Sequence, residues 1–215
     1  MKAYKGIGME GGMARWYDKT TRRDMPEFVG LAARIAAIVP PSAAVLEVAP
    51  GPGFLAIELA RRGLNVSAVD ISRTFVEIAR RNADLARVTA QFELGDAAAL
   101  PRADASVDFV VCRAAFKNFS QPVKALAEMR RVLRPGGTAL LIDMRRDASM
   151  AALKHYVDGL GVGWLNRWFM LLVFRLSLIK RAYPLEEIRR MAIDAGWAQP
   201  RIEANPIGFE AWMTR

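Results

Sequence analysis

Reactive side chains are scarce in this 215-residue sequence, which has one cysteine, Cys112, and one histidine, His155. A single cysteine excludes an intrachain disulfide, and Cys112 lies in an apolar stretch typical of a buried thiol. The shortage of both residue types leaves no Cys/His cluster of the kind that binds a metal. His155 is interpreted as a surface or lid residue rather than a base. The sequence therefore assigns no metal site, and the catalytic residues stay unknown.

Two further features are missing. The first residues lack the apolar core of a signal peptide, which makes a cytoplasmic location the default expectation. No basic run interleaved with aromatic residues is present, although the net charge is +9. The arginines come as scattered pairs, several of them near expected helix ends where cations favour the helix dipole. Nucleic-acid binding is therefore not expected, while peripheral membrane contact is kept as an option.

What the chain has instead is the composition of one folded domain, with 53% hydrophobic and 25% charged residues. The rest of the sequence is organised around residues 43–60. Val45 to Val48 predicts a short strand, and residues 49–53 contain two prolines and two glycines. From Phe54 onward apolar residues recur at helical spacing. This pattern predicts a strand, a tight loop and a helix whose free N–H groups face a ligand in the loop.

A second strand is predicted from Asn65 to Val69, and Asp70 follows it. In open α/β sheets an acid at this place hydrogen-bonds the ribose of a nucleotide-like cofactor. Residues 51–56 also satisfy the dinucleotide pattern G-x-G-x-x-[GA], so NAD(P) and a second type of cofactor both remain open at this point. Glu47 discriminates between them, because an acid there suits a cationic group and would repel a pyrophosphate.

Residues 47–53, Glu-Val-Ala-Pro-Gly-Pro-Gly, resemble motif I of the class I S-adenosylmethionine (SAM)-dependent methyltransferases, except that Ala49 replaces the usual first glycine. Residues 106–111 and 125–137 resemble the later block of the same family. The sequence pattern Ala-Leu-x-Glu-Met-x-Arg-Val-Leu-Arg-Pro-Gly-Gly is typical of the ubiquinone/menaquinone C-methyltransferase-like group. The resemblance covers residues 43–144.

The resemblance implies a Rossmann-like α/β fold with a mostly parallel seven-stranded sheet, an antiparallel last strand and a helical lid inserted after the fifth strand. It implies SAM as cofactor, with S-adenosylhomocysteine (SAH) as product. The cofactor-binding residues that it implies are Tyr17, Glu47, Ala49, Pro50, Gly51, Gly53, Asp70, Ile71, Gly95, Asp96, Ala97 and Arg113. The substrate-binding residues that it implies are Phe116, Lys117, Asn118, Trp164 and Trp168.

Four parts of the single domain are expected. Residues 1–25 are an N-terminal arm without clear periodicity, and residues 43–144 are the SAM-binding core. Residues 150–181 are interpreted as a substrate lid, because Trp164 to Ile179 is apolar on almost every side of a helix. A core helix remains the other interpretation. Residues 183–215 predict a helix and two closing strands.

The function expected from these features is methyl transfer from SAM to a small, apolar acceptor. Two alternatives stay open. One is an NAD(P)-dependent oxidoreductase, which the antiparallel last strand disfavours. The other is a non-catalytic SAM-binding accessory protein at a membrane. The sequence identifies neither the acceptor nor the oligomeric state.

Overall fold

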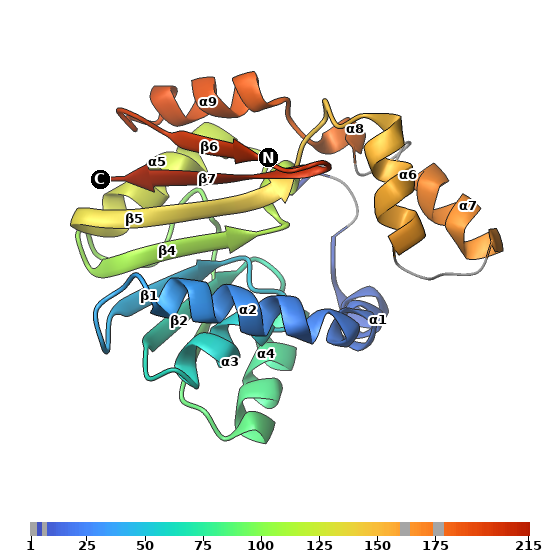
Figure 1. Ribbon diagram of the computed structural model, residues 1–215. Coiled ribbons are helices and arrows are strands. Elements are labelled where there is room, and N and C mark those ends of the chain that lie inside the picture. The colour runs from blue at the N-terminus through green and yellow to red at the C-terminus, as the bar shows by residue number, and fades with distance from the viewer. Residues whose placement is uncertain (1–3, 6–7, 160–163, 174–178) are drawn as a thin grey trace.

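A seven-stranded sheet runs through the computed structural model, which describes residues 4–5, 8–159, 164–173 and 179–215. The strand order is β3-β2-β1-β4-β5-β7-β6. Strands β3, β2, β1, β4 and β5 pair in parallel in this order, and β7 is antiparallel to both of its neighbours, β5 and β6 (Figure 1). The strands are β1 (Ala44–Val48), β2 (Asn65–Asp70), β3 (Gln91–Leu94), β4 (Val107–Arg113), β5 (Leu133–Met144), β6 (Arg201–Ala204) and β7 (Gly208–Thr214). The expected sheet with an antiparallel last strand is confirmed.

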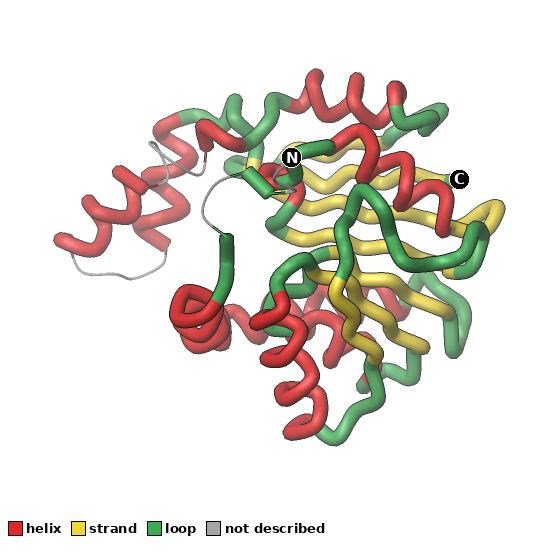
Figure 2. Tube along the Cα trace, turned by 180° about the vertical axis from the view of Figure 1, so that it is seen from behind, coloured by secondary structure: helices red, strands yellow, loops and turns green. Residues whose placement is uncertain are grey.

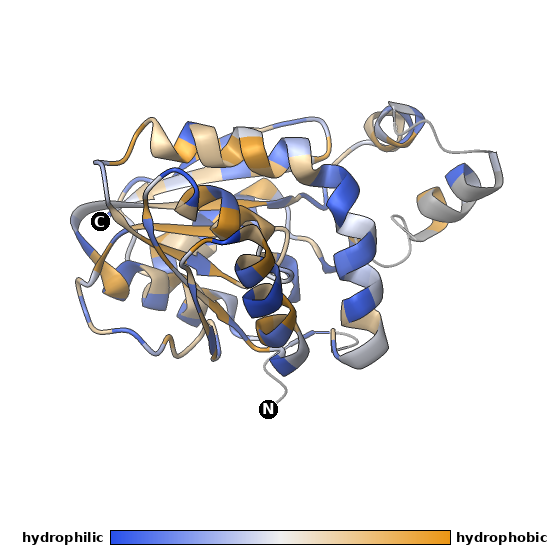
Figure 3. Cartoon of the chain, turned by 90° about the horizontal axis from the view of Figure 1, so that it is seen from below, coloured by the Kyte–Doolittle hydropathy of each residue, from blue (hydrophilic) through white to orange (hydrophobic). Residues whose placement is uncertain are grey.

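Helices cover both faces of this sheet (Figure 2). On one face α2 (Met25–Ala36), α3 (Phe54–Ala60) and α4 (Arg73–Ala86) pack against the inward side chains of β1, β2 and β4. On the other face lie α5 (Pro122–Val132) and α9 (Leu185–Asp194). Viewed from below, the strands are hydrophobic and the outer sides of the helices carry hydrophilic residues (Figure 3). Alternate residues of β1 enter the two cores, as the two-residue period of a strand requires.

Local sequence signals explain where the central helices begin. The Ser72 hydroxyl accepts a hydrogen bond from the Phe75 N–H at 3.1 Å, so Ser72 caps α4. Proline occupies the first turn of α2 and of α5, where its missing N–H is not needed. Because β1, β2, β4 and β5 run parallel, their carboxyl ends meet at one edge of the sheet, which is where ligands bind in open α/β folds.

One expectation about the flanking segments needs correction. The N-terminal arm contains an 11-residue helix, α1 (Gly11–Thr21), followed by the short helix η1 (Arg22–Asp24). Its low periodicity hid the helix because few of its side chains, among them Ala14, are buried. Of the segment interpreted as one helix over 164–179, the structure describes α7 (Trp164–Val173) and the start of α8 (Ile179–Arg181), both helical, while 174–178 lies outside the described residues. The substrate role of this region stays a prediction.

Helix α6 (Met150–Gly159) and α7 lie side by side and project beyond the carboxyl edge of the sheet (Figures 1 and 2). Within the described ranges, no helix is both long and apolar enough to span a bilayer.

Candidate functional site

The glycine loop between β1 and α3 forms the floor of the site. Gly51 and Gly53 both have positive φ angles, +56° and +82°. A Cβ on Gly53 would lie 2.9 Å from the Ala79 Cβ and 3.0 Å from the Phe92 ring, so glycine is required there by space as well as by conformation. Pro50 and Pro52 stiffen the intervening positions. The loop therefore brings bare backbone to the carboxyl edge of the sheet.

Ala49, which stands where the resembled family has glycine, also adopts a left-handed conformation with φ +58°. Its N–H donates to the Val69 carbonyl at 2.8 Å, which ties the loop to β2. A left-handed residue with a Cβ costs about 1–2 kcal/mol relative to its right-handed form. The loop thus keeps the shape that a glycine would give it and stores strain at this position.

We expect Ala49→Gly to stabilise the fold by about 0.5–1 kcal/mol, because glycine removes the strain but gains freedom in the unfolded chain. Thermal unfolding measures the change. Ala105→Gly is the matched control, since Ala105 also has a positive φ, +50°, in an exposed turn before β4. Both variants should gain stability, and only Ala49→Gly should alter SAH affinity. A lower melting temperature for Ala49→Gly would contradict the strain argument.

Asp70 ends β2 beside this loop and is buried, with 5% of its surface exposed. Its Oδ2 accepts a hydrogen bond from the Gly51 N–H at 3.0 Å, and its Oδ1 accepts one from the Ser72 N–H at 2.8 Å. Burial raises the pKa of Asp70 to about 6, although these backbone donors act in the opposite direction. A carboxylate has about four acceptor positions, so Asp70 can order the loop and still accept a bond from a ribose hydroxyl.

Glu47, on β1, is the most unusual group at this edge. Only 3% of its surface is exposed, and within the described part of the chain its Oε2 has no hydrogen-bond partner. Burial raises the pKa of Glu47 from 4.5 to about 8, while the Ala56 N–H and the Arg113 charge lower it by less. A buried carboxyl oxygen without a partner is costly for a folded protein. Such a group is suited to a cationic ligand that would complete its bonding.

The turn after β3 forms the next wall. The Asp96 Oδ1 accepts a hydrogen bond from the Ala98 N–H at 2.9 Å, which is a turn-forming contact. A Cβ on Gly95 would lie 2.8 Å from Val69 Cγ1, so Gly95 lets the turn approach β2 closely. Ala97 is half-buried in the same turn.

Two exposed apolar side chains stand near this turn. Ile71, directly after Asp70, is 42% exposed, and Leu94, which pairs with Asp70 across β2 and β3, is 47% exposed. This apolar pair, beside Asp70 and Asp96, suits contact with a flat heterocycle. The sequence prediction included Ile71 but missed Leu94, whose position becomes meaningful only through the strand register.

The N-terminal arm crosses the carboxyl edge of the sheet (Figure 1). At one end Tyr4 forms an isolated bridge with Phe119, and the Lys5 N–H donates to the Asn118 carbonyl at 2.7 Å. Tyr4 is half-buried here, and this desolvation raises its pKa; the Arg181 charge lowers the pKa by less, while the charges of Asp70 and Asp143 raise it.

The arm is anchored at its other end to α4. The Glu10 carboxylate accepts the N–H groups of Arg73 and Thr74 at 3.0 and 3.1 Å. Tyr17 contacts the Phe75 ring edge-on at 5.8 Å and lies 3.9 Å from the position that a Gly51 Cβ would occupy. The arm thus lies over the loop. Cofactor contact by Tyr17 stays a prediction, and the contacts of Tyr4, Lys5 and Glu10 were missed.

Three residues after β4, Phe116, Lys117 and Asn118, were predicted to bind substrate. The structure places them in different surroundings. Phe116 is 1% exposed and packs against Phe119 and Tyr183 at 5.7 and 5.8 Å between ring centres. Asn118 is half-buried, and its Oδ1 has no partner in the described part of the chain. Arg113 pairs with Glu27 on α2. Substrate contact by Phe116 and Asn118 and cofactor contact by Arg113 stay predictions.

Lys117 forms a buried ion pair that the sequence did not predict. Its Nζ donates to Asp143 Oδ1 at 2.8 Å, and its backbone N–H donates to Asp143 Oδ2 at 2.9 Å. Lys117 and Asp143 are 5% and 6% exposed. The Met144 N–H also donates to Asp143 Oδ1, so the carboxylate caps the end of β5. Lys117 therefore ties the segment after β4 to the end of β5, and its predicted substrate contact is not tested.

Trp164 and Trp168, expected to line the acceptor site, are 77% and 67% exposed on α7. Their side chains are therefore mostly in solvent, and their role at the acceptor stays a prediction. Among the described residues no group of His, Cys, Asp and Glu could hold a metal ion.

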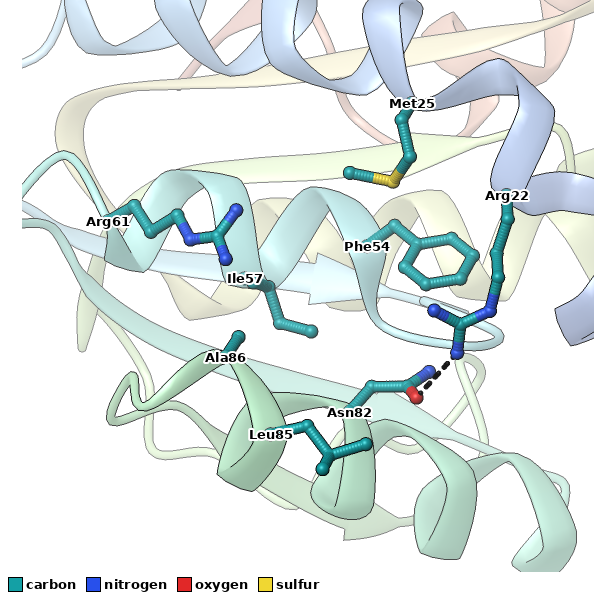
Figure 4. Close-up of a pocket in the computed structure, with 8 residues that line it drawn as sticks. All are labelled: Arg22, Met25, Phe54, Ile57, Arg61, Asn82, Leu85 and Ala86. Atoms are coloured by element: carbon teal, nitrogen blue, oxygen red, sulfur yellow. Dashed lines mark hydrogen bonds between the residues drawn. The ribbon is translucent and has the colours of Figure 1, made fainter.

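A separate hollow of about 270 Å³ lies between α3, α4 and the segment formed by η1 and the start of α2 (Figure 4). Its polar groups are bonded within the protein. The Arg22 guanidinium donates to Asn82 Oδ1 at 3.0 Å, and Arg61 pairs with Glu58. This hollow is not part of the carboxyl edge where Glu47 and Asp70 lie.

The comparisons with known proteins agree with this geometry. Residues 46–141 match the family described as "Methyltransferase domain". These residues form a class I SAM-dependent methyltransferase domain. The domain spans the glycine loop, Asp70, Asp96 and the segment through β5, and so contains most of the residues placed at the carboxyl edge.

Among curated proteins, the methyltransferase domain is 43% identical over 107 residues to the demethylmenaquinone methyltransferase of Deinococcus radiodurans, which covers 49% of this chain and 44% of that protein. It is 38% identical over 101 residues to the enzyme of the same name from Thermus thermophilus, covering 46% of each. The chain thus spans less than half the length of these relatives.

Solved structures extend the likeness of fold beyond the methyltransferase domain. A protein from Methanococcus maripaludis matches with a TM-score of 0.77 at 19% identity, covering 98% of this chain and 95% of that one. A SAM-dependent methyltransferase from Aquifex aeolicus matches with a TM-score of 0.66 at 19% identity, covering 93% and 95%. At such identities the likeness shows the fold, including the reversed strand β7.

Proposed function

We propose that this protein binds SAM at the carboxyl edge of its sheet and transfers the methyl group to a small apolar acceptor of the quinol type. The domain family supports the reaction class, and the name shared by the Deinococcus and Thermus relatives supports the acceptor class. The non-catalytic alternative finds no support in these relatives, and the reversed β7 disfavours the NAD(P) alternative.

The observation that carries the proposal is the buried, unpartnered Oε2 of Glu47 beside a glycine loop with two positive-φ glycines. The ammonium of the methionine moiety of SAM is the cation that would satisfy this oxygen. Asp70 offers acceptors for the ribose hydroxyls, and Ile71 and Leu94 offer apolar contact for the adenine. A pyrophosphate would instead place negative charge beside two carboxyls, which is unfavourable.

When bound, SAM supplies an already activated methyl group. The protein's task is to align the acceptor and to keep water away, and alignment alone can account for a large part of a rate increase. The arm from Tyr4 to Tyr17 covers the carboxyl edge and serves the second purpose. The buried Lys117–Asp143 pair fixes the segment that ends in Asn118, which gives an acceptor a rigid surface.

Calorimetry with SAH and with NADH tests the cofactor, and labelled SAM presented with reduced quinones, phenols, thiols and amines tests the acceptor. We expect SAH binding, no NADH binding and labelled product from the reduced quinones. Binding of NADH in place of SAH would overturn the proposal, and label transfer to amines alone would overturn the acceptor class.

Asp70→Asn should weaken SAH binding by about 1.5–3 kcal/mol, the usual value of a hydrogen bond to a charged group. The amide keeps the size of the side chain but replaces one acceptor oxygen with a donor, which faces either the Gly51 or the Ser72 N–H. The melting temperature should therefore also fall slightly. Asp104→Asn is the control, because Asp104 is 74% exposed and pairs only with Arg131 at 2.6 Å. Equal SAH affinity for the wild type and Asp70→Asn would remove the ribose role.

A further inference from the structure

One face of α7 exposes large apolar side chains. Trp164 is 77%, Trp168 67% and Leu172 37% exposed. The spacing of four residues places all three along one side of the helix. The helix stands away from the sheet, on the far side of α6 (Figure 1). A stripe of this kind on a projecting helix indicates a binding surface.

The stretch of sequence that contains the stripe is basic. Residues 145–183 contain seven lysines and arginines and two aspartates, a net charge of +5 out of +9 for the whole chain. Both aspartates are already paired, Asp158 with Arg167 and Asp147 with Arg145, and Arg146 pairs with Glu187. Lys154 on α6 and Lys180 on α8 are exposed. The charge around α7 is therefore complementary to a negatively charged surface.

We propose that α7 is a membrane-docking helix that lies in the interface of an anionic lipid bilayer, with Trp164, Trp168 and Leu172 in the headgroup region. Tryptophan prefers this region because its ring is apolar and its N–H is polar. A helix with such a face and basic flanks lies along the surface rather than across the membrane. Each nearby lysine or arginine adds attraction to anionic lipid.

This inference does not rest on methyl transfer, because it uses neither the glycine loop nor its acids. It also extends the proposed function, since a quinol-type acceptor dissolves in the bilayer and α7 lies at the same carboxyl edge as the cofactor site. Vesicle binding is measured without SAM or acceptor, so failure of the docking helix and failure of the enzymatic proposal are separate results.

The test uses the full chain with vesicles of phosphatidylcholine alone and with about one third phosphatidylglycerol. We expect co-sedimentation with the anionic vesicles at least about tenfold stronger than with the neutral ones, and weakened by salt. Brominated lipids should quench tryptophan fluorescence in the wild type. The double variant Trp164→Ser/Trp168→Ser should lose about tenfold or more of the binding and most of the quenching.

Trp16→Ser is the matched control, because Trp16 is 60% exposed but lies on α1. It should bind vesicles like the wild type. Lys180→Glu should weaken binding, while Lys124→Glu, an exposed lysine on α5, should have less effect. Circular dichroism and melting temperature verify that each variant is folded. Quenching of the wild type by brominated lipid tests the proposal even where a variant does not fold.

Several results would overturn the proposal. They are no binding of the wild type to anionic vesicles, equal binding by the double tryptophan variant, and equal loss in Trp16→Ser. A second copy of this chain is the other possible occupant of the stripe. Sedimentation of a wild-type dimer that the double variant dissociates, without vesicle binding, would assign the stripe to self-association instead.

Discussion

Glu47→Gln should weaken SAH binding by about 2–4 kcal/mol, roughly 30- to 1,000-fold, because it removes the charge that pairs with the ligand ammonium in a buried site. Isothermal calorimetry measures this loss. Glu58→Gln is the control, since Glu58 is an equally buried glutamate, 4% exposed, whose partners are Arg61 and Arg62. Glu58→Gln should leave SAH affinity unchanged. An unchanged affinity in Glu47→Gln would exclude the ammonium contact.

The same substitution should stabilise the ligand-free protein. Burial raises the pKa of Glu47 from 4.5 to about 8, so the folded state holds a proton that the unfolded state releases. The wild type therefore loses stability as pH rises from about 4.5 to about 8. Glutamine carries no charge, so the variant should exceed the wild type by about 2–4 kcal/mol at pH 8 and by little at pH 5. Equal stabilities at pH 8 would show that Glu47 ionises freely in the folded protein.

Affinity should follow the opposite trend with pH. SAH requires ionised Glu47, so the wild type must release a proton on binding whenever the pH lies below about 8. Its affinity should rise with pH by up to about tenfold per unit across this range. Asp70, with a pKa of about 6, steepens the dependence at the acidic end. The Glu47→Gln variant should show a flatter profile above pH 6.

The second large effect concerns the ion pair of Lys117 and Asp143. Lys117→Met should lower the free energy of unfolding by about 3–5 kcal/mol, because it leaves the Asp143 carboxylate buried without its counter-ion. The melting temperature should fall by roughly 6–20 °C. Urea denaturation and calorimetry give the two values.

The double variant Lys117→Met/Asp143→Leu distinguishes the effect of an unpaired buried charge from the effect of changed packing. Replacing both charges with apolar side chains removes the desolvation penalty, so most of the stability should return. A single variant that is as stable as the wild type would show that water reaches the pair. SAH affinity should change less than stability, since both residues lie at β4 and β5 rather than at the glycine loop.

The parts of the site that could be predicted are those in which neighbouring residues carry the signal. The loop from Ala49 to Gly53 and the acid at Asp70 depend on a strand, a turn and a strand end that are close in sequence. The reversed strand β7 followed from the family resemblance and is confirmed.

The contacts that were missed join distant positions. Lys117 and Asp143 are 26 positions apart in the sequence. The Lys5 Nζ donates to the Tyr183 hydroxyl, and these two residues are 178 positions apart. Nothing in the residues around Lys117 distinguishes a buried cation from one that faces a substrate. Helix α1 was missed for a related reason, because its stability comes from contacts such as Glu10 with the start of α4 rather than from an apolar face of its own.

The position of β7 has a consequence for protein synthesis. Strand β7 pairs with β5 on one side and with β6 on the other. Strand β6 therefore joins the sheet only through β7, although β6 comes first in the chain. A nascent chain that has completed β5 therefore exposes an unpaired edge containing Ala139, Leu140 and Leu141. At ordinary translation rates the strand that covers this edge follows on the order of 3–15 s later. During that interval the edge can pair with another chain, and chaperone demand should be greatest then.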